Sequence, residues 1–97
     1  MHQSWVYIMA NRWNSTLYVG VTSDLQARVA DHQAMKDPKA FTARYNCVKL
    51  VWYEEHSDVA TAIVREKQLK NWKRDWKDAL VVKENPNWLD LSDGWFK

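Results

Sequence analysis

The chain has 97 residues, a length typical of one domain that buries a single modest core. Its net charge of +2 is too small to identify a nucleic-acid-binding protein, so the distribution of charge along the chain has to be considered instead. No apolar run approaches the ~20 residues of a membrane span, no export signal is present, and the one cysteine, Cys47, cannot form an internal disulfide, so we expect a cytoplasmic protein without a membrane partner.

Residues 5–10 and 17–21 predict two strands, and the turn-forming residues between them predict a hairpin. If Ala10 opposes Leu17 and Tyr7 opposes Gly20, one face of the hairpin is entirely apolar, whereas a slip by one residue would mix the two faces. The apolar face then consists of Val6, Ile8, Ala10, Leu17, Val19 and Val21. The opposite face carries two phenols and consists of Trp5, Tyr7, Met9, Tyr18 and Gly20.

Gly20 is an unusual residue for the middle of a strand, because glycine has no side chain to pack and weakens the strand. The chain has only two glycines, so its position beside Tyr18 and opposite Tyr7 needs a reason. We consider two: a side chain here would fill space that a phosphate must enter, or it would crowd the two tyrosine rings.

A helix is predicted after the hairpin, with Ser23 as its N-cap and Gln26 completing a capping box. Arg28 and His32 lie one turn apart on this helix, which should stop before Asp37-Pro38. On its own, this pair also fits an ordinary solvated helix face. Residues 48–54 are rich in strand-forming side chains and predict a third strand.

A second helix is predicted to begin at Ser57 or Asp58, followed over residues 73–84 by a third helix or a bent continuation that ends near Asn85-Pro86. The tail, residues 86–97, carries two tryptophans expected to anchor it on the same single domain, residues 1–97. The order β-β-α-β-α-α predicts an α+β fold, with a small three-stranded antiparallel sheet flanked by helices.

The second predicted helix places a carboxylate in line with apolar residues. The stripe consists of Val59, Ala62, Ile63, Glu66 and Lys70. A carboxylate on such a face is unfavourable unless it is paired or binds a cation. Glu66 therefore either holds a cation or forms an ordinary ion pair with Lys70 one turn later.

Basic side chains gather in residues 61–80, where they outnumber acidic ones by six to three. This excess is larger than the net charge of the whole chain, so most of the charge asymmetry lies in one helical stretch. It either contacts phosphates or simply keeps the surface solvated. The candidates for contact with a nucleic acid are Lys67, Lys70, Lys73, Arg74 and Lys77.

Taken together in order and spacing, these motifs resemble the GIY-YIG endonuclease superfamily. The resemblance rests on Tyr7, then Tyr18-Val19-Gly20, then Arg28 with His32 one turn later, then Glu66. It is strongest to small stand-alone bacterial members related to the N-terminal nuclease domain of the excinuclease ABC system, and it covers nearly the whole chain. One departure is that the first motif reads Trp5-Val6-Tyr7, without the family's leading glycine.

The resemblance implies roles for individual residues. Tyr7, Tyr18, Arg28 and His32 match catalytic positions, Gly20 matches the glycine of the second motif, and Glu66 matches the carboxylate that holds a single Mg²⁺ or Mn²⁺ ion. Asn85 is a tentative match to an asparagine near the end of the domain. No pattern for zinc, a P-loop or a dinucleotide is present, so no small-molecule cofactor is expected.

The function implied is a divalent-metal-dependent endonuclease that hydrolyses DNA, in repair or in the processing of structured DNA. An unperturbed tyrosine has a pKa of about 10, so a tyrosine base needs nearby positive charge, which Arg28 would supply. The alternatives are a non-catalytic DNA-binding module that retains the fold, and a protein-interaction domain with exposed tryptophans. Targeting by a partner protein or by homodimer formation is a further expectation.

Overall fold

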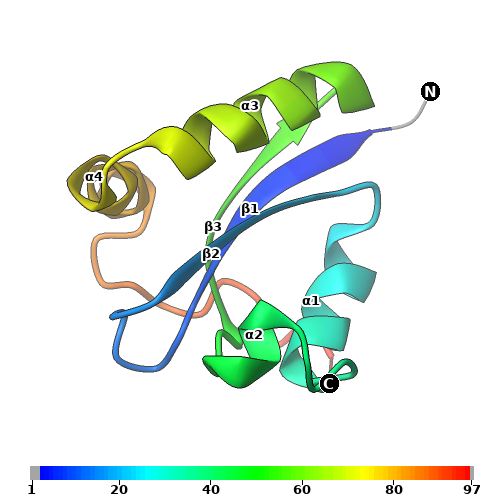
Figure 1. The fold of residues 1–97 in the computed structure, drawn as a ribbon, viewed down its shortest axis with the longest axis vertical. Helices are drawn as coiled ribbons and strands as arrows, with labels where there is room; N and C mark the ends of the chain where they lie inside the picture. Colours follow the sequence, from blue (N-terminus) through cyan, green and yellow to red (C-terminus); the bar gives the residue numbers. More distant parts are fainter. Residues whose placement is uncertain (1–2, 97) are drawn as a thin grey trace.

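The computed structural model describes residues 3–96 as a three-stranded antiparallel sheet with helices on both faces (Figure 1). The strands are β1 (Ser4–Ala10), β2 (Leu17–Thr22) and β3 (Lys49–His56), and β1 lies in the centre of the order β2-β1-β3. The helices α1 (Leu25–Gln33) and α2 (Phe41–Arg44) lie on one side of the sheet, and α3 (Val59–Asn71) lies across the other. The fold is therefore α+β, as the sequence predicts.

The hairpin register is confirmed at every predicted pair, from Val6 opposite Val21 to Ala10 opposite Leu17. Tyr7 lies opposite Gly20 on β2 and opposite Tyr53 on β3. Because β1 is central and both of its faces are covered, six of its seven residues are buried. The strand therefore contributes apolar side chains to one side of the sheet and aromatic side chains to the other.

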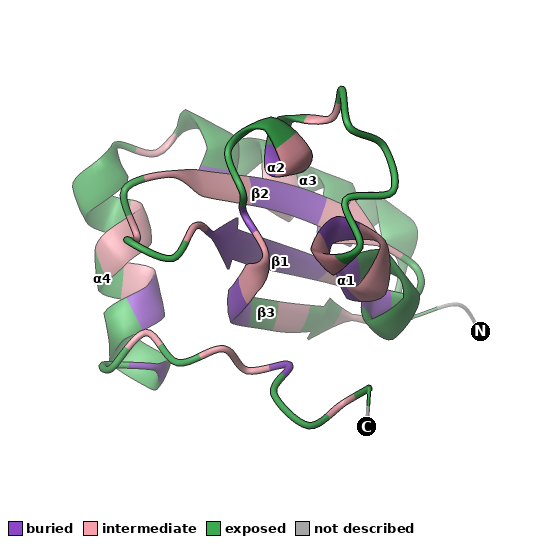
Figure 2. Cartoon of the chain, turned by 90° about the horizontal axis from the view of Figure 1, so that it is seen from below, coloured by how far each residue is buried: buried purple, intermediate pink, exposed green. Residues whose placement is uncertain are grey.

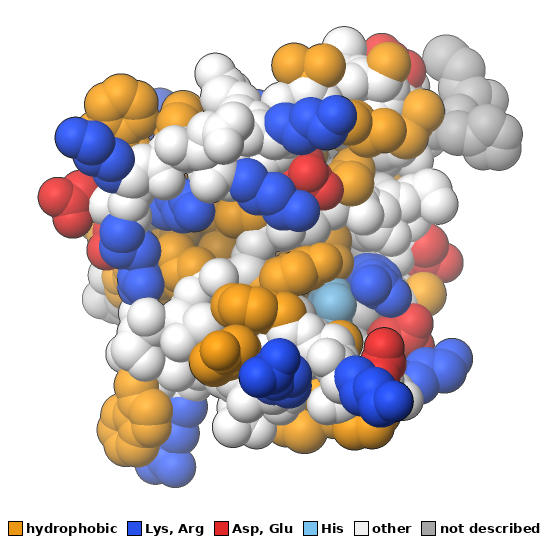
Figure 3. All heavy atoms as spheres, in the orientation of Figure 1, with side chains coloured by type: hydrophobic (Ala, Val, Ile, Leu, Met, Phe, Trp, Pro, Cys, Tyr) orange, Lys and Arg blue, Asp and Glu red, His pale blue; other side chains and the backbone are white. Residues whose placement is uncertain are grey.

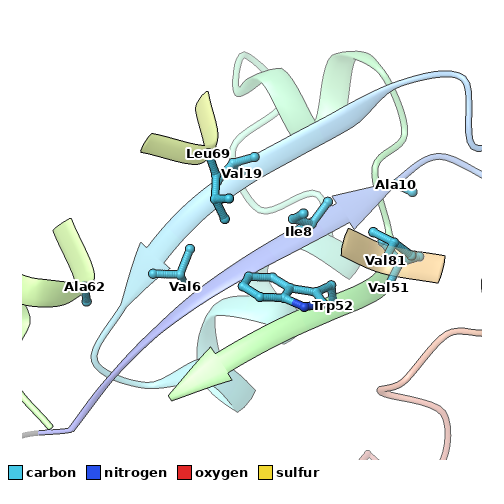
Figure 4. Close-up of a cluster of buried hydrophobic side chains, with 9 residues drawn as sticks. All are labelled: Val6, Ile8, Ala10, Val19, Val51, Trp52, Ala62, Leu69 and Val81. Atoms are coloured by element: carbon cyan, nitrogen blue, oxygen red, sulfur yellow. The ribbon is translucent and has the colours of Figure 1, made fainter. Parts of the chain in front are cut away.

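The main hydrophobic core lies between the sheet and the helices α3 and α4 (Arg74–Glu84) (Figure 4). On α3 the most buried residues are Ala62 and Leu69, seven positions or about two helical turns apart. The predicted stripe on this helix was therefore partly wrong, because Val59 and Ile63 are exposed. Ile63 follows Ala62 directly, and one residue is about 100° of rotation around a helix, which turns Ile63 away from the sheet.

The cap of α1 is Asp24, and the prediction of Ser23 was wrong by one residue. The Asp24 carboxylate accepts a hydrogen bond from the backbone N–H of Ala27 at 3.1 Å, while the Thr22 hydroxyl accepts one from the Asp24 N–H at 3.0 Å. This local turn shifts the start of the helix one position along the chain. On α3 the cap is Asp58, one of the two predicted residues, which accepts from Thr61 N–H at 2.8 Å.

Two elements differ from the sequence-based expectation. The short helix α2 was not predicted, because four residues are too few to show a helical period. The strand β3 runs to His56, since the alternating exposure of Tyr53, Glu54 and Glu55 continues the strand beyond its apolar part. No helix among residues 3–96 is long and apolar enough to cross a membrane.

The segment after α4 runs beside β3 (Figure 2). The backbone N–H of Leu91 donates to the carbonyl of Leu50 at 2.7 Å, and the Leu50 N–H donates to the Asp90 carboxylate at 3.2 Å. Gln33 on α1 donates to the Ser92 hydroxyl at 2.8 Å, which connects the tail to the aromatic side of the sheet. Trp88 packs against the main core and Trp95 against the cluster on the other face.

Candidate active site

A chain of buried hydrogen bonds lies between β1, α1 and α2. The Tyr7 hydroxyl is 2.8 Å from His32 Nε2, and His32 Nδ1 is 2.9 Å from the Thr42 hydroxyl. Tyr7 is 1% exposed, His32 6% and Thr42 3%, so the three side chains are withdrawn from bulk water. Both partners of the imidazole are hydroxyls, which can donate or accept, so the chain is satisfied in either tautomer of His32.

Tyr18 lies beside this chain at the outer edge of the sheet. Its ring is 6.2 Å from that of Tyr7 and stands edge-on to the His32 ring at 5.5 Å between centroids. Unlike Tyr7, Tyr18 is only partly buried. The hairpin register and the helical spacing thus bring Tyr7, Tyr18 and His32 together from β1, β2 and α1.

Arg28 places a positive charge next to both phenols. Burial alone would lower the pKa of the Arg28 guanidinium, but its combined interactions with Tyr7 and Tyr18 outweigh burial and raise that pKa, so the group stays charged. Arg28 is largely exposed. A guanidinium of this kind can donate two parallel hydrogen bonds to a phosphate.

The two buried ionisable groups are both held neutral near pH 7. Burial is the largest cause of the raised pKa of Tyr7, and the neighbouring Tyr18 adds to it, while Arg28 opposes the shift without offsetting it. Burial and then the Arg28 charge lower the pKa of His32 to about 4, against a smaller opposite effect of Asp31. A neutral imidazole and a neutral phenol can therefore share one hydrogen bond here.

The space above Gly20 is occupied by Tyr7. A Cβ atom on Gly20 would lie 2.5 Å from the Tyr7 Cζ and hydroxyl oxygen and 2.9 Å from a ring carbon of Tyr18. Of the two reasons considered for this glycine, the structure supports the crowding of the rings and not an open space for phosphate. Its absent side chain lets the phenol of Tyr7 lie directly on the backbone of β2.

Glu66 lies on α3, on the other side of the sheet from α1. Its side chain is 14% exposed and its carboxylate is 3.5 Å from Lys70 Nζ. Within the described part of the chain, no hydrogen bond or ion pair joins Glu66 to Tyr7, Tyr18, Arg28 or His32. Figure 3, which looks onto the β2 side of the sheet, shows an acidic side chain below α3 and a histidine between α1 and α2 on one surface.

The donor set around Glu66 suits only a loosely held hard cation. Among residues 3–96 there is no group of three or more His, Cys, Asp or Glu side chains placed to hold a metal ion. Mg²⁺ is commonly held by one or two carboxylates and keeps several of its waters. The half-buried carboxylate of Glu66 fits that requirement, because its partner Lys70 has a side chain that is 50% exposed and free to move away.

The predicted basic residues are not equivalent. Lys67, Lys70 and Lys73 are exposed, and Lys77 is partly buried. The prediction that Arg74 contacts a nucleic acid does not fit the structure, because its guanidinium is already engaged. It donates to Asp78 at 2.7 Å and to the hairpin-turn carbonyls of Ser15, at 2.9 Å, and Asn14.

The tentative assignment of Asn85 to the site is wrong. Asn85 is 4% exposed, and its amide nitrogen donates to the carbonyls of Val51 at 3.1 Å and Leu89 at 2.9 Å. Its side-chain oxygen accepts from the Leu89 N–H at 3.0 Å. With both ends of the amide bound to backbone, Asn85 fixes the start of the tail and has no part in the cluster of tyrosines.

Residues of α2 also belong to this region, and the sequence reasoning missed them. Thr42 ends the hydrogen-bond chain, and a cavity of about 130 Å³ beside it is bordered by Arg28, His32 and Thr42. Phe41 lies with its ring 6.0 Å from Tyr18. The only signal in the sequence was the alternation of aromatic and polar residues in the segment Phe41–Tyr45, which has no helical or strand period.

Comparison with known proteins agrees with this site. The family described as the GIY-YIG catalytic domain matches residues 3–79, most of the chain. The chain therefore belongs to the GIY-YIG family, whose domain is of a nuclease type. It carries the family's two tyrosines on adjacent strands and its arginine on the following helix.

Relatives of similar length share the whole domain. The UPF0213 protein SH2523 of Staphylococcus haemolyticus is 38% identical over 84% of this chain and 96% of its own. The UPF0213 protein YE0453 of Yersinia enterocolitica is 29% identical over 92% of this chain and 91% of its own. The solution NMR structure of the UPF0213 protein BH0048 from Bacillus halodurans has a TM-score of 0.57 at 23% identity, covering 91% of this chain and 92% of that one, which shows the shared fold.

Proposed function

We propose that the protein is a divalent-metal-dependent endonuclease that hydrolyses phosphodiester bonds of DNA. The observation that carries the proposal is the convergence of Tyr7, Tyr18, Arg28 and His32 on one side of the hairpin. Hydrolysis of a phosphodiester needs a base for the attacking water and positive charge for the phosphoryl oxygens. Tyrosine and arginine side chains at this position can supply both.

Tyr18 is the better candidate for the base. It is partly exposed and can meet a water molecule, whereas Tyr7 is buried, bonded to His32 and held neutral by its raised pKa. Arg28 beside it would bind the scissile phosphate and stabilise negative charge on the oxygens. Tyr7 and His32 act as positioning residues, because they pack against the Tyr18 ring from two sides.

A metal ion held by Glu66 would supply charge neutralisation at the phosphate and the leaving oxygen. Mg²⁺ or Mn²⁺ is the expected ion, since a single carboxylate with water and phosphate oxygens suits both. Lys67, Lys70 and Lys73 would add contacts to the DNA backbone that carry no sequence preference.

The test is nicking of supercoiled plasmid in Mg²⁺ or Mn²⁺, with EDTA as the metal-free condition. Wild type should nick, and Arg28→Ala and Glu66→Gln should lower the rate by about 100-fold or more. Arg12→Ala and Glu84→Gln are matched controls, because both are exposed residues of the same type away from the tyrosines. Equal rates for all five proteins would contradict the proposal.

A non-catalytic DNA-binding module is the second candidate, and the ion pair between Glu66 and Lys70 favours it, because this pair satisfies the carboxylate without a metal. Calorimetric titration with Mn²⁺ separates the two. A nuclease should bind Mn²⁺ through Glu66 and lose that binding in Glu66→Gln. A binding module should show DNA affinity that falls with salt but the same absence of Mn²⁺ binding in both proteins.

A further inference from the structure

Three aromatic rings run outward in a row from the candidate active site. The ring centroid of Phe41 lies 6.0 Å from Tyr18, and that of Tyr45 lies 4.6 Å from Phe41. Phe41 and Tyr45, which we call the aromatic platform, are 44% and 46% exposed. Figure 3 shows hydrophobic side chains gathered on the surface around α2, next to the histidine.

The aromatic platform is fixed to the site although α2 has only four residues. Thr42, the neighbour of Phe41, is buried and hydrogen-bonded to His32 Nδ1 at 2.9 Å. The Thr42 carbonyl accepts from the N–H of Cys47 at 2.8 Å, and Cys47 is fully buried in the cluster under α1. Any ligand on the platform is therefore held at a constant position relative to Tyr18.

The charges around the aromatic platform are mainly positive. Residues 36–46 contain Lys36, Lys39 and Arg44 against a single acid, Asp37. The Arg44 guanidinium lies over the Tyr45 ring, 5.9 Å from its centroid, and Arg28 lies on the far side, next to Tyr18. Flat aromatic faces flanked by arginines match a nucleobase with its phosphate, because the base stacks while the phosphate takes the positive charge.

We propose that the aromatic platform binds an unpaired nucleobase of DNA adjacent to the phosphate at Tyr18. Bases within a duplex are already stacked on their neighbours and cannot reach an exposed ring without being unstacked. The preferred substrates are then DNAs with unpaired nucleotides at the cleavage point, such as bulges and single-stranded branches. This inference rests on the proposed function, since it names the substrate class of the same site.

The test measures binding to two duplexes that differ by an inserted bulge of a few nucleotides, one of them 2-aminopurine, without metal ions. Wild type should bind the bulged duplex more tightly than the paired duplex, and the probe's fluorescence should be quenched by stacking. Tyr45→Ala and Phe41→Leu should weaken binding to the bulged duplex by about 5-fold or more and leave the paired duplex unchanged. Tyr45→Phe, which keeps the ring, should behave as wild type.

Trp76→Ala is the matched control, because Trp76 is an aromatic residue 58% exposed on α4. If wild type binds both duplexes equally, or if Trp76→Ala weakens binding to the bulge as much as Tyr45→Ala, the aromatic platform is not a base-binding site. Repeating the assay with Mg²⁺ separates this inference from the proposed function. A preference for the bulge without cleavage would overturn the nuclease alone, and cleavage without a preference would overturn the platform alone.

Discussion

On strand β1, Val6, Ile8 and Ala10 point to the face covered by α3 and α4, whereas Tyr7 and Met9 point to the face covered by α1. The first face is built from apolar side chains and has nothing to titrate. The second face holds the neutral Tyr7 phenol and the neutral His32 imidazole in one hydrogen bond. Neighbouring residues of one strand therefore belong to stability and to chemistry, and single substitutions can separate the two.

The largest effect is expected at Tyr18. Tyr18→Phe should lower the rate of DNA cleavage by about 10²- to 10⁴-fold, because it removes the proposed general base. The free energy of unfolding should change little, since the side chain is only partly buried. Cleavage kinetics together with urea unfolding check both parts. Tyr53→Phe, at an exposed tyrosine of β3, should leave cleavage unchanged, and an equal loss in both variants would contradict the role of Tyr18.

On the opposite face, Ile8→Ala should cost about 2–5 kcal/mol of stability, because it leaves a cavity in the main core. The rate of cleavage per folded molecule should stay close to that of wild type, since Ile8 has no contact with the tyrosines. Urea unfolding gives the stability, and cleavage below the unfolding midpoint gives the rate. A loss of activity without a loss of stability would show that the two faces are not separable.

Acid should destabilise the chemical face through His32. Its pKa in the folded protein is about 4, lower than the ~6.5 of an unfolded histidine, so the unfolded chain binds the proton more readily. The stability present above pH ~6.5 should decrease as the pH falls toward 4, by on the order of 3 kcal/mol. Urea unfolding from pH 7 to 4 measures this slope.

His32→Gln is the control for this pH dependence. It removes the titrating group, so its stability should vary less between pH 6.5 and 4 than that of wild type. Carboxylates such as Asp31 remain in both proteins, so only the difference between the two slopes reports on His32. Identical slopes would mean that the histidine is not buried as a neutral group.

Gly20→Ala joins the two sides of the comparison, because the new Cβ would displace the Tyr7 ring from the backbone of β2. Stability should fall by about 1–3 kcal/mol from overpacking, and cleavage per folded molecule should fall by up to ~100-fold as Tyr7 and Tyr18 move. Urea unfolding and cleavage rates measure the two losses. Val19→Ala, one residue earlier on the core face, should reduce stability only.

The smallest effect is expected on the surface of α3. Lys67→Ala should change the free energy of unfolding by less than ~0.5 kcal/mol and lower the salt dependence of DNA binding by about one unit in the logarithmic slope. Binding measured at several salt concentrations checks this value. Lys83→Ala, an exposed lysine of α4, is the comparison, and an equal change there would show that the positive charge acts without regard to position.

The sheet and most of the cluster could be predicted from sequence because they follow from short periods. Alternation fixed the pairing of Tyr7 with Gly20, and one helical turn related Arg28 to His32. The failures concern side chains that bind distant backbone. Arg74 reaches the hairpin turn about 60 residues away, and Asn85 reaches Val51 on β3, contacts with no local pattern. The aromatic platform was missed for the same reason, because only the folded chain brings Phe41 to Tyr18.

Asn85 and the tail also determine how the sheet meets other molecules. An outer strand with unpaired N–H and carbonyl groups is a template on which a strand from another chain can add, leading to aggregation or domain swapping. Asp90 and Leu91 bind both polar groups of the Leu50 backbone, and Asn85 binds the carbonyl of Val51. The residue that resembled a catalytic asparagine therefore helps to protect this small sheet from intermolecular strand addition.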